Sequence, residues 1–514
     1  MIPATRLGLS SERLRAAAPY AVLVALNLLD RFPALLNAAA VHSDAAIVGL
    51  QAMHVLRGEN SRFLWGADYQ GSFDAYVVAA FFAVGGTNPL TLMLAPILGH
   101  LVLCCAVLAM LVRQLGSRAT ALVACLPLVF TPQAINGVVV YAPRQWSITF
   151  VLVGAAVMAW PAKRFVPERL ALGLGLCVLA VYLDMFCVLW LPAVGLLALL
   201  VCLDPPLRLR TVAVRLAGAG VGTVLGTWAV RALRQSDVAK NYGVTVDLSV
   251  IERTWPLLRD TSLPWLLGAK VWIPGQNLYP DLWLPPAPVR ALQLFGALSI
   301  LALALGSGVL AFSRRIPWSV KRMVLFGAAA SSTALVAFLV SGWPVDMWST
   351  RYLAPLVWSL PFTLAALAYR LRRRGLIALL APYLVVAAIG GWLSWGPYVD
   401  GLLPRLDARG AATEEGELGD YLRQRGFENG YAQRWLAHRL TFLWHEHPAI
   451  ASFEPNRYPP YAAAADQAKK KAYLFHPSEP RAQPGPYLRA LRQRPGKVEV
   501  KRVAGFTVIL YEEP

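Results

Sequence analysis

The residues best suited to chemistry gather between positions 41 and 86. This stretch lies between long apolar runs and carries acidic, aromatic and glycine residues, among them His42, Asp44 and Asp74. The pattern predicts a helix from Asp44 to Leu56, which places the Asp44 carboxylate at the positive end of the helix dipole. Such a carboxylate either accepts a proton as a general base or serves only as the helix N-cap. The residues alone leave both roles open.

Polar residues interrupt the apolar pattern again at three later points. Arg144 lies between two apolar runs, Asp184 divides another, and Arg351 closes a segment that begins at Gly342. An arginine beside a membrane helix either extends its charge toward the interface or donates hydrogen bonds to a phosphate in a partly dry site. Arg351 is therefore a candidate anion-binding residue.

The elements that would position these residues are those of a membrane protein. Of the 514 residues, 57% are hydrophobic and 15% charged, and the mean hydropathy is +0.50; soluble domains are roughly 45–50% apolar and about 25% charged. The net charge of +19 comes from clusters between apolar runs, a pattern that orients membrane proteins and argues against nucleic acid as a partner. The six cysteines lie within or at the ends of apolar runs and predict neither disulfides nor zinc.

The apolar runs predict about eleven transmembrane segments. Arg13 and Arg15 precede the first run, and if they are cytoplasmic the later basic clusters fall on the same side. We therefore expect a multi-pass protein of the inner (plasma) membrane with a cytoplasmic N-terminus and an extracytoplasmic C-terminus. The expected segments cover residues 17–40, 90–112, 119–135, 146–161, 170–183, 185–203, 212–231, 290–312, 323–341, 353–369 and 375–395.

Two parts of this topology depend on a choice. The run from Phe73 to Val84 could cross the membrane, but it would then place the later basic clusters outside, so we expect an interfacial helix. Residues 170–203 would form one helix about 51 Å long against a hydrocarbon core of about 30 Å. Two short segments joined at Asp184 fit better, and they place that charge at the outer surface.

The composition becomes polar near residue 395, which predicts a transmembrane domain over 1–395 and a second domain over 396–514. Strand-like segments at 449–453, 472–476, 498–502 and 505–511 alternate with helical patches near 417–424, 434–443, 461–471 and 486–493. They predict a small extracytoplasmic α/β domain. The tail also contains His445, Glu446 and His447, but adjacent histidines do not share a helix face, which disfavours a metal site.

Two short motifs lie among the polar residues that interrupt the apolar runs. Residues 66–75, GADYQGSFDA, followed by Gly85 and Gly86, are similar to a GQxYxGSLEA…LFG pattern, with Asp74 where glutamate is usual. Arg351, Tyr352, Leu353 and Pro355 resemble an RYLLP stretch. With these motifs the chain resembles the GT-C superfamily of polyprenyl-phosphate-sugar-dependent glycosyltransferases. The second outer loop holds Arg144, where the bacterial branch related to protein O-mannosyltransferases and lipid A aminoarabinose transferases often carries an arginine. The resemblance covers nearly the whole chain.

The resemblance implies an α-helical polytopic fold with two interfacial helices in the first outer loop. It also implies inverting transfer of a sugar from a polyprenyl-phosphate donor to a glycan, a lipid-linked glycan or a protein at the outer membrane face, with no nucleotide and no cofactor; it leaves metal dependence open. Asp44 would be the general base, and Arg351 and Arg144 would bind the donor phosphate. The substrate-binding residues would be Tyr69, Asp74, Tyr352, Asp184 and His42.

Two other functions are alternatives to this interpretation of the sequence. A lipid or glycan transporter would carry ionisable residues in paired, broken spans near the membrane centre, whereas nearly all charges here fall outside the predicted spans. A catalytically inactive accessory membrane protein would have the same topology without the chemistry.

Overall fold

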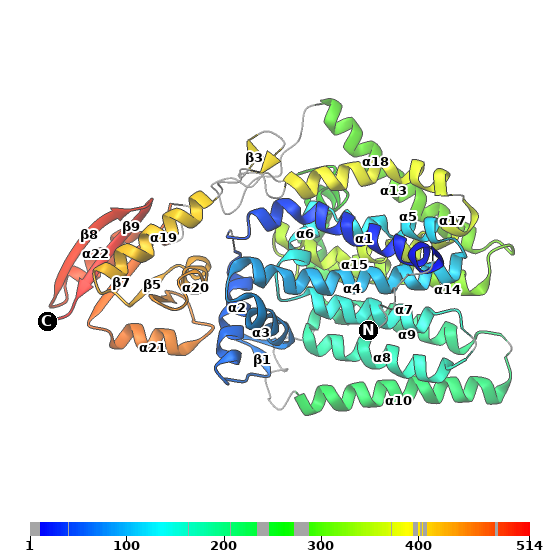
Figure 1. The fold of residues 1–514 in the computed structure, drawn as a ribbon, viewed down its shortest axis with the longest axis horizontal. Coiled ribbons are helices and arrows are strands. Elements are labelled where there is room, and N and C mark those ends of the chain that lie inside the picture. The colour runs from blue at the N-terminus through cyan, green and yellow to red at the C-terminus, as the bar shows by residue number, and fades with distance from the viewer. Residues whose placement is uncertain are drawn as a thin grey trace, which may run out of the picture.

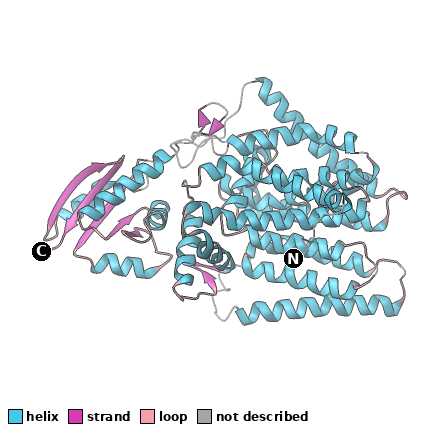
Figure 2. Cartoon of the chain, viewed as in Figure 1, coloured by secondary structure: helices cyan, strands magenta, loops and turns pink. Residues whose placement is uncertain are grey.

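The computed structural model describes residues 11–39, 41–162, 164–205, 207–233, 246–271, 287–371, 373–393, 399–400, 403–404, 409–477 and 482–514. Long helices dominate this part of the chain and lie side by side in a bundle (Figure 1). Apart from two short hairpins, the strands gather in the C-terminal region at one end of the molecule (Figure 2). The protein is thus a multi-pass helical membrane protein with a small α/β region.

Nine helices of the described residues are long and apolar enough to cross a membrane. Helices occur at all the predicted positions, but two of them differ from simple spans. The helices α5 (Arg118–Val129) and α6 (Gln133–Val140) form a pair bent by 93°, and α7 (Gln145–Ala159) has 15 residues. The nine long helical runs are α1 (Ser11–Leu36), α4 (Pro89–Leu115), α8 (Val166–Leu183), η1 with α9 (Met185–Trp190, Leu191–Cys202), α10 (Leu209–Leu233), α13 (Ala287–Ala311), α14 (Trp318–Val340), η5 with α15, α16 and α17 (Met347–Leu353, Ala354–Trp358, Leu360–Thr363, Ala365–Arg370) and α18 (Arg373–Leu393).

Side chains from two other helices satisfy the backbone at the bend between α5 and α6. Pro132 begins α6 without an N–H group, so the α5 ladder cannot continue through it. Arg31 of α1 donates a hydrogen bond to the carbonyl of Val129 (3.1 Å), and His100 of α4 donates one to the carbonyl of Leu128 (2.8 Å). Since an unsatisfied carbonyl in lipid costs several kcal/mol, these buried polar residues stabilise a broken helix inside the bundle.

The short helix α7 also ends inside the protein. Its last carbonyl, that of Ala159, accepts hydrogen bonds from Gln114 of α4 (2.8 Å) and Arg322 of α14 (3.1 Å). Arg322 pairs in addition with Asp204, at 3.1 Å. These buried side chains donate to a carbonyl that would otherwise need the N–H groups of a further helical turn. Helix α7 can therefore end inside the protein after 15 residues.

Asp184 divides the long apolar run as predicted. Helix α8 ends at Leu183, η1 begins at Met185, and the Asp184 carboxylate accepts a hydrogen bond from the N–H of Phe186 (2.9 Å). The carboxylate is buried and caps the start of η1, where unpaired N–H groups need acceptors. The predicted pair of short spans is confirmed.

The segment predicted as the first outer loop, residues 41–86, forms two helices and a hairpin at one end of the bundle. The strands β1 (Phe63–Leu64) and β2 (Ala67–Gly71) lie between α2 (Ser43–Leu56) and α3 (Phe73–Gly85), and α2 runs across the direction of the spans (Figure 1). Both predicted helices are present. The hairpin was not predicted, because a strand of two residues is too short to show an alternating pattern.

Part of the long loop between α10 and α13 is described as four short helical segments. They are η3 (Leu248–Val250), α11 (Ile251–Pro256), η4 (Leu257–Ser262) and α12 (Leu263–Leu266). Both η4 and α12 pack against η5, the segment that carries Arg351. This loop therefore supports the start of the span that follows it.

The C-terminal region contains a five-stranded sheet with the order β6-β5-β7-β9-β8. The strand β5 is parallel to both of its neighbours, whereas β9 is antiparallel to β7 and β8. The predicted strands and helices are present; β5 was missed because it has only four residues and contains a glycine. The domain boundary predicted at residue 396 lies outside the described residues. The elements are β3 (Val399–Asp400), β4 (Leu403–Pro404), α19 (Arg409–Gln424), β5 (Asn429–Ala432), α20 (Arg434–Leu443), β6 (Ala449–Ser452), α21 (Pro459–Gln467), β7 (Lys470–Phe475), α22 (Pro484–Arg492), β8 (Lys497–Val503) and β9 (Phe506–Glu512).

The α/β region packs directly on the first outer loop. Helix α20 lies against α2, where a side chain in place of Gly49 would come within 2.6 Å of the Phe442 ring. The Phe442 ring also stacks on Phe82 of α3, with a centroid distance of 6.2 Å. A shared apolar core therefore joins the two regions and fixes the residues at their junction.

Candidate active site

Asp44 lies at the junction between the first outer loop and the C-terminal α/β region. It is the second residue of α2, and its own N–H donates to Nδ1 of His42 (3.2 Å), which is the N-cap. The alternative that Asp44 is the N-cap is therefore wrong. The Asp44 carboxylate instead accepts a hydrogen bond from Arg457 (2.8 Å), a residue of the loop between β6 and α21.

The electrostatic surroundings of Asp44 favour its ionised form. Desolvation by the surrounding protein raises the pKa of this carboxyl group, but the attraction of Arg457, followed by those of His42, Arg144 and Arg351, outweighs it and lowers the pKa. The side chain nevertheless keeps 35% of its surface exposed. Asp44 is thus an accessible carboxylate surrounded by cationic side chains.

Arg144 is held in place by a buried carboxylate. Its Nε donates to Asp184 at 3.0 Å, and Gln70 of β2 donates to the same oxygen at 2.8 Å. Burial lowers the pKa of Arg144, but the attraction of Asp184 and of nearby Tyr352, Tyr69 and Asp44 raises it overall. The Asp184 carboxylate therefore caps the start of η1 and also binds Arg144. Its hydrogen bond with Gln70 joins β2 of the first outer loop to the bundle.

Arg351 has no such counter-charge. It lies in η5, which Asp346 starts by capping the N–H of Ser349. Its guanidinium lies over the Tyr352 ring, 5.1 Å from the centroid, and Nη2 donates to the Tyr352 hydroxyl at 3.4 Å. Within the described residues no carboxylate pairs with Arg351, and its buried Nε has no hydrogen-bond partner. A buried donor of this kind is available to an anionic ligand.

The other predicted site residues surround this group. The imidazole of His42 lies between Tyr141 and Trp435, with ring centroids 6.0 and 5.7 Å away. Desolvation, the largest cause, lowers the pKa of His42, although the side chain is exposed to solvent. Burial raises the pKa of Tyr69. Neutral, polar side chains therefore lie beside the charged ones.

Asp74 is the exception among the acidic residues. It is buried in the first turn of α3, and in the part of the chain that the structure describes its Oδ1 has no hydrogen-bond partner. Desolvation, with repulsion from Asp184 as the second cause, raises the pKa of Asp74 to about 7. Asp74 therefore holds its proton to a higher pH than Asp44 does.

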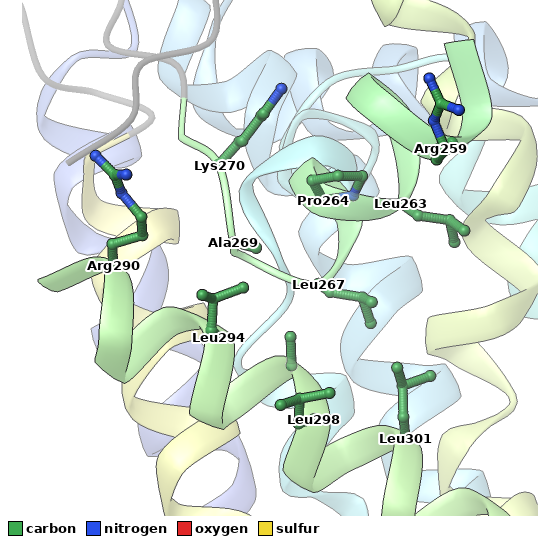
Figure 3. A pocket seen from close by; sticks show the side chains of 11 residues that line it. Arg259, Leu263, Pro264, Leu267, Ala269, Lys270, Arg290, Leu294, Leu298 and Leu301 are labelled. Atoms are coloured by element: carbon green, nitrogen blue, oxygen red, sulfur yellow. The ribbon is translucent and has the colours of Figure 1, made fainter. Parts of the chain in front are cut away.

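A separate cavity of about 350 Å³ lies between α12 and α13, and none of Asp44, Arg144 and Arg351 lines it. Its walls are apolar, with leucines from both helices facing the space (Figure 3). Three cationic residues stand around it, namely Arg259, which pairs with Asp260 at 2.7 Å, Lys270 and Arg290.

Sequence comparison finds no matching protein-family model and no significant match to a curated protein. The structure, in contrast, is similar to solved membrane proteins. ArnT from Cupriavidus metallidurans bound to undecaprenyl phosphate matches 96% of this chain and 98% of its own, with a TM-score of 0.50 and 13% identity. The chain has the GT-C fold.

Two further structures are similar to this chain. ArnT from the same organism in the apo state covers 96% of this chain and 98% of its own, with a TM-score of 0.48 and 13% identity. The Archaeoglobus fulgidus oligosaccharyltransferase in the apo form covers 88% of this chain and 69% of its own, with a TM-score of 0.47 and 12% identity. The match to ArnT with bound undecaprenyl phosphate, at a TM-score of 0.50, confirms the fold that the sequence motifs imply.

The sequence did not point to two polar residues that this GT-C structure brings into the group. Arg457 comes from the C-terminal α/β region and contacts Asp44, while Gln70 comes from β2 and binds Asp184. Gln70 lies between two motif residues, Tyr69 and Gly71, and this position was the only feature of the sequence that could have indicated it as a site residue. Arg457 lies in a polar loop, and nothing in its local pattern connects it with Asp44.

Within the described ranges, no group of three or more His, Cys, Asp and Glu side chains is arranged to hold a metal ion. Glu446 of the HEH stretch instead binds His54 (2.7 Å) and Tyr461 (2.6 Å). Arg457, Arg144 and Arg351 are cationic side chains near Asp44 that can stabilise negative charge.

Proposed function

We propose that this protein is an inverting glycosyltransferase that transfers a sugar from a polyprenyl-phosphate donor to an acceptor hydroxyl at the outer face of the cytoplasmic membrane. The observation that carries the proposal is an ionised, accessible carboxylate, Asp44, with Arg144 and Arg351 close enough to lower its pKa. A base and cations for a leaving phosphate are the groups that such a transfer requires.

Asp44 is the proposed general base. Arg457 donates to Oδ1, and among the described residues Oδ2 has no hydrogen-bond partner. This oxygen can accept the proton of an acceptor hydroxyl as that hydroxyl attacks the sugar carbon. Direct attack, without a covalent intermediate on the enzyme, inverts the configuration at that carbon.

Arg351 and Arg144 are the proposed partners of the donor phosphate. Negative charge develops on the phosphate as the glycosidic bond breaks, and a guanidinium can donate two parallel hydrogen bonds to it. Arg351 fits this role better, because Arg144 already binds Asp184. Tyr352, Tyr69 and His42, which lie near these charged residues, are the proposed contacts of the sugar or the acceptor, and Asp184 positions Arg144.

The cavity between α12 and α13 is suited to the isoprenoid chain of the donor. Its walls are leucine-rich and cationic residues stand around it (Figure 3). One of its walls, α12, packs against η5, which carries Arg351. A lipid chain in this cavity would lie beside the element that holds its phosphate. ArnT, which shares the fold, is bound to undecaprenyl phosphate in its crystal structure.

A transporter is less well supported by these observations. The Asp30–Arg31 pair is buried within α1, as a transport residue would be. However, Arg31 also donates to the carbonyls of Asn27 and Val129, which gives it a structural role. The cationic group around Asp44 lies at the end of the bundle, as expected for an enzyme that acts at the outer face.

The test is transfer by the purified protein from a panel of radiolabelled polyprenyl-phosphate sugars, with membrane glycolipids, glycans and proteins as acceptors. We expect Asp44→Asn to be folded and at least about a hundredfold slower, because general-base catalysis contributes about 10²- to 10⁴-fold. Asp420→Asn, at an exposed surface carboxylate, is the matched control. Parent protein that transfers no sugar from any donor, or Asp44→Asn with parental turnover, would contradict the proposal.

A further inference from the structure

Arg457 reaches the base from another part of the fold. It is 413 residues from Asp44 in sequence, and its Nη2 lies 2.8 Å from Asp44 Oδ1. Only 11% of its side chain is exposed, and its buried Nε has no hydrogen-bond partner within the described residues. The contact is therefore more than a flexible surface ion pair, whose partners usually keep most of their hydration.

The hairpin of the first outer loop leaves space for Arg457. Gly66 lies between β1 and β2 with φ of +62°, a conformation that side chains rarely adopt. A Cβ atom at this position would lie 2.6 Å from Cγ and 2.8 Å from Cα of Arg457. Only glycine therefore satisfies both the turn and the close approach of Arg457.

A hydrogen-bonded cluster fastens two other segments of the C-terminal region, the loop between α20 and β6 and the start of α21, to α2 and the residues that follow it. His54 of α2 binds Glu59 through Nδ1 and Glu446 through Nε2, each at 2.7 Å. Glu446 also pairs with Arg57 (2.5 Å) and accepts a hydrogen bond from the Tyr461 hydroxyl (2.6 Å). We call these residues, His54, Arg57, Glu59, Glu446 and Tyr461, the His54 cluster.

Aromatic rings complete the His54 cluster next to Arg457. The neighbouring residue, Tyr458, stacks on Trp65 with a centroid distance of 4.0 Å, and its hydroxyl donates to Glu59 at 3.2 Å. Both rings also meet His54 in T-shaped contacts, with centroid distances of 4.9 and 5.1 Å. The residue next to Arg457 is therefore held against the first outer loop.

We propose that Arg457 is a positioning residue for Asp44, and that the His54 cluster docks the C-terminal region so that Arg457 completes the active site. Arg457 fixes Oδ1, keeps the carboxylate charged and leaves Oδ2 directed to the acceptor. The expected effect on rate rests on the proposed function, whereas the coupling of Arg457 to Asp44 does not.

The electrostatic part of this role predicts that the loss of Arg457 changes the transfer rate by an amount that depends on pH. Among the charges that lower the pKa of Asp44, Arg457 contributes most, and desolvation opposes it. Without the guanidinium the pKa rises, so the base is protonated at acidic pH and ionised again at higher pH. A residue that only tethers the two regions would change the rate by the same factor at every pH.

The first experiment measures coupling without any activity. Thermal unfolding of the full-length protein in detergent is compared for the parent, Asp44→Asn, Arg457→Gln and the double variant. We expect the two single changes to be non-additive, because residues in direct contact share an interaction energy. Additive effects would overturn the proposal even if the enzyme transfers sugar, and coupling in a protein without transferase activity would contradict only the proposed function.

The second experiment measures transfer rate against pH for Arg457→Gln, Arg457→Lys and the control Arg502→Gln, which changes an exposed arginine of β8. We expect the acid limb of the Arg457→Gln profile to move up by about one unit or more, so that the rate falls about tenfold there. Arg457→Lys keeps the charge and should restore the limb. An Arg457→Gln profile that parallels the parent at every pH would overturn the proposal.

Variants away from the site test the docking. Gly66→Ala displaces Arg457, and Glu446→Gln weakens the His54 cluster, yet neither changes Asp44 or a phosphate-binding arginine. We expect both to reproduce the shift of the acid limb, together with faster hydrogen exchange in α2 and α20. Unchanged profiles and unchanged exchange in both variants would show that Arg457 is not positioned in this way.

Discussion

Asp44 and Asp74 lie in the same outer loop but have opposite electrostatic surroundings. Attraction by Arg457 and other cationic groups overcomes desolvation and lowers the pKa of Asp44, whereas desolvation dominates at Asp74 and raises its pKa to about 7. Two carboxyl groups whose surroundings separate their pKa values can take different roles in one site. Asp44 is suited to accept a proton, and Asp74 can donate a hydrogen bond when protonated.

The raised pKa of Asp74 predicts that Asp74→Asn stabilises the folded protein by an amount that depends on pH. The folded state holds the proton to a higher pH than the unfolded state, so the parent loses stability as pH rises from about 4 through 7. The asparagine variant lacks this loss, which for such a shift is roughly 4 kcal/mol. Melting temperatures in detergent should be similar at pH 4.5 and higher for Asp74→Asn at pH 8. If the melting temperatures of the parent and the variant differ equally at both pH values, ionisation of Asp74 is not the cause of the difference.

Arg351 predicts a graded loss of donor binding. Lysine at this position keeps the charge but lacks the planar fork that can meet two phosphate oxygens. Since a hydrogen bond to a charged group contributes about 1.5–3 kcal/mol, Arg351→Ala should weaken binding of polyprenyl phosphate about 10- to 100-fold, and Arg351→Lys less. Titration with the labelled lipid measures both, with the exposed Arg423→Ala as control. Parental affinity in both variants would contradict the proposed role.

At the scale of elements, the bend between α5 and α6 depends on polar groups that face away from lipid. Arg31 satisfies the carbonyl of Val129 at this bend and lies 3.5 Å from the buried carboxylate of Asp30. Arg31→Leu would leave that carboxylate without its partner, a change that typically costs 3–5 kcal/mol. We expect a marked fall in melting temperature in detergent.

A charge-balanced variant separates the two contributions of Arg31. The double change Asp30→Asn with Arg31→Leu removes the unpaired charge, so that only the lost hydrogen bonds to the carbonyls of Asn27 and Val129 remain. We expect this double variant to be more stable than Arg31→Leu. If both variants melt like the parent, the polar network does not support the bend.

At the scale of the whole molecule, the connections between helices fall into two sets. The connections α4–α5, α7–α8, α9–α10, α13–α14 and α17–α18 carry the basic clusters, whereas the intervening connections carry Asp44, Arg144, Asp184 and Arg351. Basic connections remain cytoplasmic in most membrane proteins. The active-site residues and the C-terminal region are therefore expected outside.

Cysteine labelling tests this orientation. In a background without the six native cysteines, Asp420→Cys and Arg502→Cys should react with a membrane-impermeant maleimide in intact cells, after permeabilisation of any outer membrane. Arg315→Cys, between α13 and α14, should react only after lysis. All three positions are exposed in the structure. The reverse pattern would place the site on the cytoplasmic side.

The sequence by itself determined the membrane class, the positions of the helices and the residues that interrupt them. Hydropathy and charge are sums over neighbouring residues, so the eleven apolar runs and the division at Asp184 can be read along the chain. The sequence also predicted Asp44, Arg144 and Arg351 individually as candidate site residues. Broken and short helices were less visible, because the groups that cap them, such as Arg31 and Gln114, come from other helices.

Only the tertiary structure decided how these residues act on one another. The cap of α2 is His42 and not Asp44, which differs from the expected pattern. Arg144 pairs with Asp184 and Asp44 contacts Arg457, and both contacts join segments that lie far apart in the sequence. The lowered pKa of Asp44 and the raised pKa of Asp74 follow from burial and from the distances to such partners. These quantities depend on packing in three dimensions, for which no local pattern in the chain is a substitute.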